Sequence, residues 1–238
     1  MKRVIVTGAS QGIGLVIAQT LINEGWEVLN LDLSPPSNGA QVSWIEVDLT
    51  DPAALERVLE DITGQGPVTG LVNNAGIGIA SLLDDTSDED FDKTVAVNMR
   101  APMICARAVA PGMRKQGFGR IVNISSRAQL GKTHRTAYAA TKGGLLAMGR
   151  VWALEMAGDG ITVNAIAPGP VRTELFERTN PPDMPRTREI IDSIPVGRIG
   201  EPEDIANAVA FFMKEKSGYI TGQTLYVCGG ISLARGGS

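Results

Sequence analysis

The sequence predicts an α/β fold in which a doubly wound parallel sheet is covered by helices on both faces. Short apolar, β-branched runs recur along the chain, apolar residues at helical spacing lie between them, and glycine-rich turns join several of them. With 238 residues, 43% hydrophobic and 20% charged, the chain can build a sizeable core. We therefore expect one domain over residues 1–238.

The first predicted unit is a strand, a glycine turn, a helix and a second strand. Residues 4–6 form a β-branched run that is typical of a strand buried on both faces. Apolar residues at helical spacing follow over residues 13–21, and Gly25 ends that pattern. Residues 27–31 are the next apolar run. This order is a βαβ crossover of about 30 residues.

The alternation of strands and helices continues to the end of the chain. Further strands are expected at residues 42–47, 70–72, 120–124, 161–166 and 224–227. Helices are expected at residues 52–62, beginning near Asp51, and at 137–156, while Ser87 with Asp90 resembles an N-cap and its box partner. Residues 174–195 are rich in Pro, Arg, Asn and Asp, which predicts a mobile excursion outside the core.

Composition disfavours several classes of function. The formal net charge is -4 without a basic run, which argues against a nucleic-acid partner. Cys105, Cys228 and the single His134 are too few and too scattered for a zinc site, so no metal is expected. Because no run approaches the roughly 18 apolar residues of a membrane span and no signal-peptide pattern opens the chain, we expect a soluble cytoplasmic protein.

A glycine-rich turn at residues 7–14 follows the first strand and opens the first helix. Glycines let the backbone approach a pyrophosphate, whose charge is favoured at a helix N-terminus. Asp32, 18 positions beyond Gly14, can accept hydrogen bonds from the adenosine ribose and would repel a 2′-phosphate, and Gln11 supplies no positive charge for one. The alternative is that Asp32 only caps a turn with Ser34. The sequence predicts NAD(H) rather than NADP(H).

Taken together, the motifs resemble the classical short-chain dehydrogenase/reductase family over essentially the whole chain. The matching pieces are residues 7–14, Asp48-Leu49, residues 73–76, Asn98, Ser125-Ser126, Tyr138 with Lys142, and Pro168-Gly169. The resemblance implies a three-layer Rossmann-type fold with a seven-stranded parallel sheet and a catalytic tetrad of Asn98, Ser126, Tyr138 and Lys142. It implies cofactor contacts from Gly8, Ser10, Gln11, Gly12, Ile13, Gly14, Asp32, Leu33, Asp48, Leu49, Asn74, Ala75, Gly76, Tyr138, Lys142, Pro168, Gly169, Val171 and Thr173.

Tyr138 and Lys142 also make chemical sense without the resemblance. They are four residues apart and therefore share one face of a helix. A free phenol has a pKa of about 10, too high for an efficient base near neutrality. A nearby ammonium group favours the phenolate, and a serine hydroxyl can hold the substrate oxygen. The family further implies that Lys142 reaches the nicotinamide ribose and that Asn98 anchors a water that connects Lys142 to solvent.

Two serines compete for the catalytic position. Counting from the fifth strand places the catalytic hydroxyl at Ser126, whereas counting back the family's common 13 residues from Tyr138 gives Ser125. Neighbouring residues of a strand face opposite ways, so only one of them should point at the substrate. We favour Ser126, with a one-residue deletion between it and Tyr138.

The substrate is less well defined than the cofactor. Arg127 and Arg178 are candidate anchors for a carboxylate, a phosphate or a polyhydroxylated substrate, and Arg186 and Arg188 of residues 174–195 suggest the same role. A surface role is the alternative for all of them. His134 is expected in a solvated loop. Since residues 174–195 hold few large apolar side chains, a small polar substrate is favoured. The family implies a homotetramer that uses the small residues around Tyr138.

The predicted function is hydride transfer between NAD(H) and a secondary alcohol, sugar or hydroxy acid. The first alternative is an NADPH-dependent reductase similar to 3-oxoacyl-carrier-protein reductases, which Asp32 and Gln11 disfavour. Enoyl reductases of the superfamily space the tyrosine and lysine six residues apart, unlike this chain. A non-catalytic NAD-binding regulator would need only the glycine turn and Asp32, so the complete tetrad disfavours it.

Overall fold

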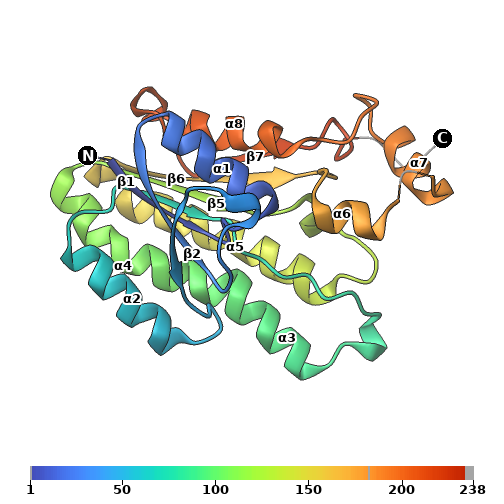
Figure 1. The fold of residues 1–238 in the computed structure, drawn as a ribbon, viewed down its shortest axis with the longest axis horizontal. Helices are drawn as coiled ribbons and strands as arrows, with labels where there is room; N and C mark the ends of the chain where they lie inside the picture. Colours follow the sequence, from blue (N-terminus) through green and yellow to red (C-terminus); the bar gives the residue numbers. More distant parts are fainter. Residues whose placement is uncertain (1, 182, 234–238) are drawn as a thin grey trace.

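The computed structural model describes residues 2–181 and 183–233 and contains one parallel sheet of seven strands in the order β3-β2-β1-β4-β5-β6-β7 (Figure 1). The strands are β1 Lys2–Thr7, β2 Trp26–Asp32, β3 Ser43–Glu46, β4 Gly70–Asn73, β5 Gly119–Ile124, β6 Ile161–Pro168 and β7 Thr224–Val227. Each of the seven strands lies on or beside a predicted strand. The doubly wound Rossmann-type fold is therefore confirmed.

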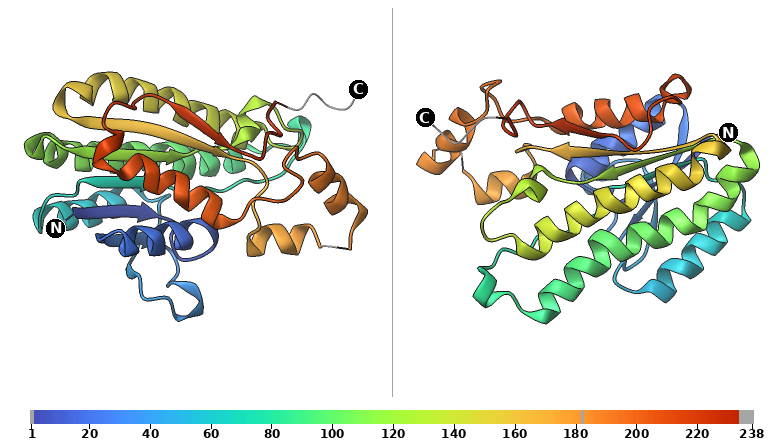
Figure 2. Two further views of the ribbon diagram at one scale, coloured as in Figure 1. Left: turned by 90° about the horizontal axis from the view of Figure 1, so that it is seen from above. Right: turned by 180° about the vertical axis from the view of Figure 1, so that it is seen from behind.

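Helices cover both faces of the sheet (Figures 1 and 2). The helices are α1 Gly12–Asn23, α2 Pro52–Gly64, α3 Asp88–Val95, α4 Ala101–Gln116, α5 Thr136–Met156, α6 Glu174–Thr179, α7 Pro185–Asp192 and α8 Pro202–Met213. α2, α4 and α5 bury one apolar cluster against the sheet, and α1 and α8 bury the other. None of the described helices is long and apolar enough to cross a membrane.

Two helix starts follow the local sequence signals. The Asp51 carboxylate accepts hydrogen bonds from the backbone N–H groups of Ala53 and Ala54, both at 3.0 Å, at the start of α2. The Ser87 hydroxyl accepts one from the Asp90 N–H at 3.1 Å, at the start of α3. Both caps satisfy N–H groups that a helix leaves without internal partners, and both predicted helix starts are confirmed. The Asp90 carboxylate, predicted as the box partner of Ser87, has no described hydrogen bond to the Ser87 N–H.

The structure also contains elements that the sequence pattern did not define. The sequence pattern predicts no bounds for α4 and α8, and a π-helical segment, Ala96–Arg100, joins α3 to α4. The expected excursion at residues 174–195 contains α6 and α7, which lie beyond the carboxyl ends of the strands (Figure 2). Within it Thr187 and Ile194 are buried, so this segment is not wholly outside the packing.

The carboxyl ends of the strands meet along one edge of the sheet, where the predicted site residues gather. The chain runs from β1 through β2 to β3 on one side and resumes with β4 on the other side of β1. In open α/β sheets, ligands bind in the crevice outside such a reversal of strand order. The glycine turn after β1 and the polar residues after β4 therefore face each other where a cofactor would bind.

Candidate active site

The glycine turn is fixed by contacts that leave no room for side chains. Gly8 has a φ of +67°, and a Cβ atom on it would lie 2.9 Å from the Cα of Ala75. A Cβ atom on Gly14 would lie only 2.1 Å from the carbonyl oxygen of Gly8. These contacts press the first turn of α1 against the end of β1. Only glycine fits at either position, as the predicted cofactor turn requires.

The amino end of α1 can accept an anionic group. Gln11 is its N-cap residue, and no side chain caps the helix there. Gly12 has a φ of +55°, and the only atoms near a Cβ atom on it would belong to Thr173, the nearest at 3.5 Å. Uncapped N–H groups at a helix N-terminus, next to a glycine with open space, suit a pyrophosphate. The residues present therefore fit a dinucleotide cofactor.

Asp32 lies at the carboxyl end of β2 and is partly exposed. One of its carboxylate oxygens accepts a hydrogen bond from the Ser10 N–H at 3.0 Å, and the other accepts a longer one from the Ser34 N–H at 3.5 Å. The carboxylate is thus tied to the glycine turn as well as to its own turn. Residues 33–42 contain no Lys or Arg, so no cation from this loop offsets its charge.

Asn74 connects the turn after β4 to the glycine turn. Its side-chain amide donates to the carbonyl oxygens of Thr7 and Gly8 at 3.0 and 2.9 Å. The Thr7 hydroxyl in turn accepts from the backbone N–H groups of Asn74 and Ala75, both at 3.1 Å. This network holds the ends of β1 and β4 together at the crevice.

The other predicted cofactor residues of this half of the crevice occupy different environments. Ser10 is 3% exposed, and its hydroxyl is hydrogen bonded to Asn30 and to the Ser34 carbonyl. Asp48 is exposed and accepts from the N–H and hydroxyl of Thr50, both at 2.8 Å. Partly exposed or exposed residues at this edge are Ile13, Leu33, Leu49, Ala75 and Gly76.

Tyr138 and Lys142 lie one turn apart near the start of α5, with the Lys142 Nζ 5.8 Å from the centre of the tyrosine ring. Lys142 is 2% exposed and donates to the carbonyl oxygen of Ile124 at 2.8 Å. Burial lowers the pKa of this ammonium group to about 8. A Cβ atom on Gly76 would lie 2.9 Å from Nζ, so the glycine leaves space for the lysine head group.

The acidity of Tyr138 differs from the sequence-based expectation. Burial raises the pKa of its phenol, and this effect outweighs a hydrogen bond from the Ser126 side chain and the charge of Arg135, which both lower it. The net shift is therefore upward, rather than the acidification that the neighbouring lysine was expected to cause. The Lys142 ammonium group donates to the Ile124 carbonyl.

Ser125 and Ser126 have different surroundings. The Ser125 hydroxyl is buried and donates to the carbonyl oxygen of Lys142 at 2.8 Å, which ties β5 to α5. The Ser126 hydroxyl is partly exposed, accepts from the Ala128 N–H at 3.1 Å and interacts with the Tyr138 phenol. Only Ser126 therefore shares the space in front of the tyrosine.

Asn98 lies fully buried within the π-helical segment. Its side-chain oxygen accepts from the Ile77 N–H, and its amide donates to the Ile77 carbonyl, both at 2.9 Å. The amide also donates to the Thr141 hydroxyl at 3.0 Å. Single π-helical turns often occur at functional sites, and this one directs Asn98 between the β4 turn and α5.

The segment after β6 closes the crevice from the other side. Gly169 donates its N–H to the Val227 carbonyl at 3.0 Å, and a Cβ atom on it would lie 2.8 Å from the Cα of Cys228. Val171 is buried, and the Thr173 hydroxyl caps α6 by accepting from the Phe176 N–H at 3.2 Å. Because the Thr173 methyl group faces Gly12, the predicted nicotinamide segment lies over the glycine turn.

Two of the residues around Tyr138 were missed in the sequence. Arg135 donates to the Gly78 carbonyl at 2.5 Å, and Lys132 precedes it in the same loop. The signal that could have found them is the absence of Asp and Glu from residues 126–138, which leaves the separate charges of Arg127, Lys132 and Arg135 without nearby carboxylates in the sequence. Of the predicted substrate residues, Arg127 opens the turn after Ser126, whereas Arg178 is exposed on α6. His134 is exposed with a φ of +61°.

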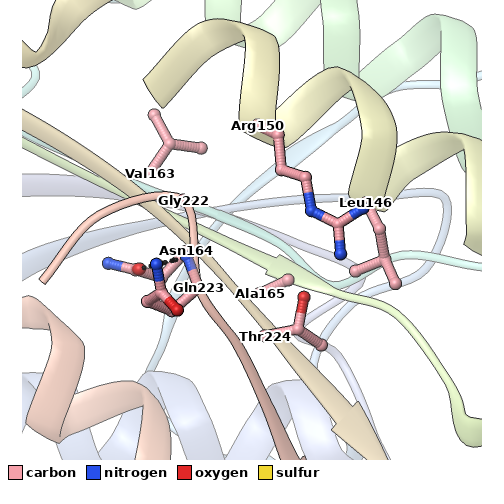
Figure 3. Close-up of a pocket in the computed structure, with 9 residues that line it drawn as sticks. Leu146, Arg150, Val163, Asn164, Ala165, Gly222, Gln223 and Thr224 are labelled. Carbon is pink, nitrogen blue, oxygen red and sulfur yellow. Dashed lines mark hydrogen bonds between the residues drawn. The ribbon is translucent and has the colours of Figure 1, made fainter. Parts of the chain in front are cut away.

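Two cavities of the structure are lined by residues other than Tyr138. One lies between α5, β6 and the residues around the start of β7, and its lining includes Leu146, Arg150, Asn164 and Gln223 (Figure 3). Its volume of about 10 Å³ suits a single water molecule. A second cavity, of about 320 Å³, lies between the end of β7 and the start of α8 and includes Cys228 in its lining. Neither cavity is lined by a tetrad residue.

Comparisons with known proteins agree with this geometry. A family model described as enoyl-(acyl carrier protein) reductase matches residues 8–232. The chain is 39% identical to the 3-oxoacyl-(acyl-carrier-protein) reductase FabG of Escherichia coli over 97% of both chains. It is 36% identical to the hydroxy(phenyl)methylsuccinyl-CoA dehydrogenase subunit BbsD of Thauera aromatica, over 98% of this chain and 97% of that one.

Solved structures show the same likeness. One is a proposed NAD(P)-dependent gluconate 5-dehydrogenase from Beutenbergia cavernae with bound NADP at low occupancy. It superposes with a TM-score of 0.91 and 33% identity, over 98% of this chain and 97% of that one. The similarity thus includes the whole sheet and both helical layers.

Proposed function

Because the chain belongs to the classical short-chain dehydrogenase/reductase family, we propose that Tyr138 is the acid and base of its reaction. The protein is an oxidoreductase that transfers a hydride between a nicotinamide dinucleotide and the carbon of a hydroxyl or carbonyl group. The observation that supports the proposal is that the Ser126 side chain is hydrogen bonded to the Tyr138 phenol while the Lys142 Nζ lies 5.8 Å from the centre of the tyrosine ring.

In this mechanism the Ser126 hydroxyl holds the substrate oxygen beside the Tyr138 phenol. In the direction of reduction the phenol donates its proton to the oxygen as negative charge develops there; in oxidation the phenolate takes that proton back. The bound nicotinamide ring supplies or accepts the hydride. Since burial raises the pKa of Tyr138, the free chain holds the phenol protonated at neutral pH, ready to act as an acid.

Lys142 and Asn98 support the tyrosine. The pKa of Lys142, about 8, lets the ammonium group lose or gain a proton near neutrality, so it can exchange protons with groups in the crevice. Asn98 is hydrogen bonded to the backbone of Ile77 and to the hydroxyl of Thr141, the residue before Lys142. In our proposal Lys142 also binds the nicotinamide ribose, next to the gap left by Gly76.

The test is turnover of a panel of alcohols and ketones, followed by NADH or NADPH absorbance, with Tyr138→Phe as the decisive variant. We expect kcat to fall by about 100-fold to 10,000-fold, because an acid–base catalyst is lost. Binding of the dinucleotide, measured by fluorescence titration, should be largely retained. Unchanged turnover in the variant would remove the proposed mechanism.

We further propose that NAD(H) is the preferred cofactor. The support is the partly exposed Asp32 carboxylate beside the glycine turn, in a loop that contains no Lys or Arg. A carboxylate there favours ribose hydroxyls over a 2′-phosphate. Asp32→Asn should weaken discrimination against NADPH while leaving the Ser10 contact possible. A wild-type kcat/KM that is higher with NADPH than with NADH would contradict this preference.

A second candidate function is an NADPH-dependent reductase that acts on 3-oxoacyl groups. It is favoured by the similarity to the Escherichia coli reductase and by the NADP bound in the related gluconate dehydrogenase structure. The comparison of NADH with NADPH, together with an acyl thioester in the substrate panel, distinguishes it from the small polar substrate that we favour. The spacing of Tyr138 and Lys142 does not favour an enoyl reductase.

A homotetramer is part of the proposal. α5 exposes Ala140, Ala147, Val151 and Leu154 on its surface, and β7 exposes Leu225. Apolar residues exposed on two neighbouring elements suit a subunit interface. Sedimentation equilibrium that reports a monomer would contradict it. The role of the whole chain as one cofactor-binding domain and its cytoplasmic location remain predictions.

A further inference from the structure

The loop between Ser126 and Tyr138 gathers positive charge beside the reactive groups. Residues 126–138 include Arg127, Lys132 and Arg135 and no Asp or Glu. Across residues 2–181 and 183–233, the ion pairs between carboxylates and cations involve other arginines and lysines, namely Lys2, Arg3, Arg107, Arg114, Arg172, Arg198 and Lys214. The charge of this loop is therefore not compensated within the described chain.

Arg135 is held next to the catalytic ring. Its guanidinium donates to the Gly78 carbonyl, and its Nη1 lies 3.4 Å from the point that a Cβ atom of Gly78 would occupy. The Cδ2 atom of Tyr138 lies 3.1 Å from the same point. The guanidinium and the tyrosine ring thus flank one glycine. Arg135 is also close enough for its charge to lower the pKa of the phenol against the effect of burial.

The remaining cations lie near one another. Burial lowers the pKa of Lys132, and repulsion by Arg135, Arg127 and Arg186 lowers it further, in that order. Arg186 comes from α7, so two segments far apart in the sequence contribute to the cluster. Arg178 is not among the repelling groups. Like charges held together without anions raise the energy of a surface, and a bound anion relieves it.

We propose that Arg127, Lys132, Arg135 and Arg186 form an anion-binding subsite that selects substrates with a carboxylate or phosphate close to the reacting carbon. The inference rests on the proposed function, since it places this subsite next to the ring of Tyr138. Guanidinium groups bind both kinds of anion through paired N–H donors. An anion seated beside Arg135 brings its neighbouring hydroxyl or carbonyl carbon toward Ser126 and Tyr138. Arg135 acts as a specificity-determining residue.

Binding of small probes tests the subsite without any turnover. Malonate and inorganic phosphate are titrated by calorimetry into the full chain saturated with NADH, and malonamide serves as the uncharged counterpart. We expect one of the anions to bind and malonamide not to bind. Arg135→Gln and Lys132→Gln should each weaken binding of the anion by about 10-fold to 100-fold, the range for a hydrogen bond to a charged group. Arg57→Gln makes the same charge change on the exposed face of α2 and should alter the affinity for the anion less than 3-fold.

The two anions distinguish the ligand class. Stronger binding of malonate assigns a carboxylate substrate, and stronger binding of phosphate assigns a phosphorylated one; either supports the subsite. The subsite proposal is overturned if neither anion binds to the wild type. It is also overturned if Arg57→Gln weakens anion binding as much as Arg135→Gln and Lys132→Gln do. Because Tyr138→Phe should still bind the anion, a failed subsite and a failed catalytic assignment give different results.

With substrates from the alcohol panel, the same variants give a kinetic readout. Arg135→Gln should raise KM for 3-hydroxybutanoate by at least 10-fold and change KM for its methyl ester less than 3-fold, with partial rescue by Arg135→Lys. For phosphorylated substrates the corresponding pair is glucose 6-phosphate and glucose. An equal rise in KM for the charged and uncharged members of a pair that is turned over would contradict the proposal.

Discussion

The two halves of the carboxyl edge of the sheet are built in different ways. Around the glycine turn, positions are set by backbone contacts, such as that between Gly14 and Gly8, and by the amide of Asn74. Around residues 126–138 and 174–195, exposed cations and two short helices of six and eight residues form the surface. The first half is rigid and tolerates few residue types, whereas the side chains of the second half can vary without disturbing the sheet.

This difference separates the shared chemistry from the choice of substrate. A dinucleotide is the same molecule in every enzyme that uses it, so its site can be fixed by the backbone. Substrates differ, and residues on connecting segments can change to suit them because little packing depends on them. The four predictions below test this contrast, from the largest expected effect to the smallest.

The largest effect is expected at Ser125 and Ser126, which lie next to each other at the boundary between the two halves. Ser126→Ala should lower kcat by about 100-fold to 1,000-fold, because a hydrogen-bond donor to the developing charge is lost. Ser125→Ala should leave kcat within about 3-fold and instead lower the free energy of unfolding by about 1 kcal/mol, since its hydroxyl bonds the Lys142 carbonyl. Steady-state kinetics and urea unfolding measure both; the reverse pattern would assign catalysis to Ser125.

The next effect concerns the buried ammonium group of Lys142. Its pKa falls from 10.5 in an unfolded chain to about 8, so the unfolded chain binds more protons between these pH values and stability rises with pH across this window. The free energy of unfolding therefore decreases as the pH falls from 10.5 through 8, by about 3 kcal/mol in total. Lys142→Met should remove it, as seen by comparing urea unfolding at pH 7.5 and pH 10. Lys115→Met, an exposed lysine, should retain the wild-type dependence on pH.

A smaller effect is expected in the rigid half. Gly14→Ala places a methyl group 2.1 Å from the Gly8 carbonyl oxygen, so the backbone must shift. We expect a loss of about 2 kcal/mol in the free energy of unfolding, together with weaker dinucleotide binding. The control is Gly64→Ala, where no atom lies within 4 Å and the backbone is helical. Equal stabilities of the two variants would show that the turn is not tightly packed.

The smallest effect is expected within residues 174–195. The buried Thr187 hydroxyl donates to the Pro181 carbonyl at 2.7 Å, and Thr187→Val removes that bond while keeping the volume. We expect the free energy of unfolding to fall by about 1 kcal/mol. Proteolysis of residues 174–195 should become faster, and the dinucleotide affinity should stay unchanged. The exposed Thr133→Val provides the comparison. Loss of dinucleotide binding in Thr187→Val would show that the two halves are coupled.

Much of the fold could be predicted because its signals are local. Apolar runs of β-branched residues gave strands such as β1 and β6 to within a few residues. Asp51 and Ser87 marked helix starts because each side chain bonds N–H groups two or three residues away. The π-helical segment gave no such signal, since its altered hydrogen bonding depends on how Asn98 is bonded to Ile77 and Thr141.

The sequence by itself determined the parallel sheet and the glycine turn, because periodicity and spacing act within one element or one turn. The proposed tetrad came from the resemblance of the motifs to the family. Only the tertiary structure decided which serine faces Tyr138, why burial raises the pKa of that phenol, and that Arg186 of α7 joins the cations of residues 127–135. Burial and charge interactions depend on segments that are distant along the chain. Their distances are set only when the layers pack.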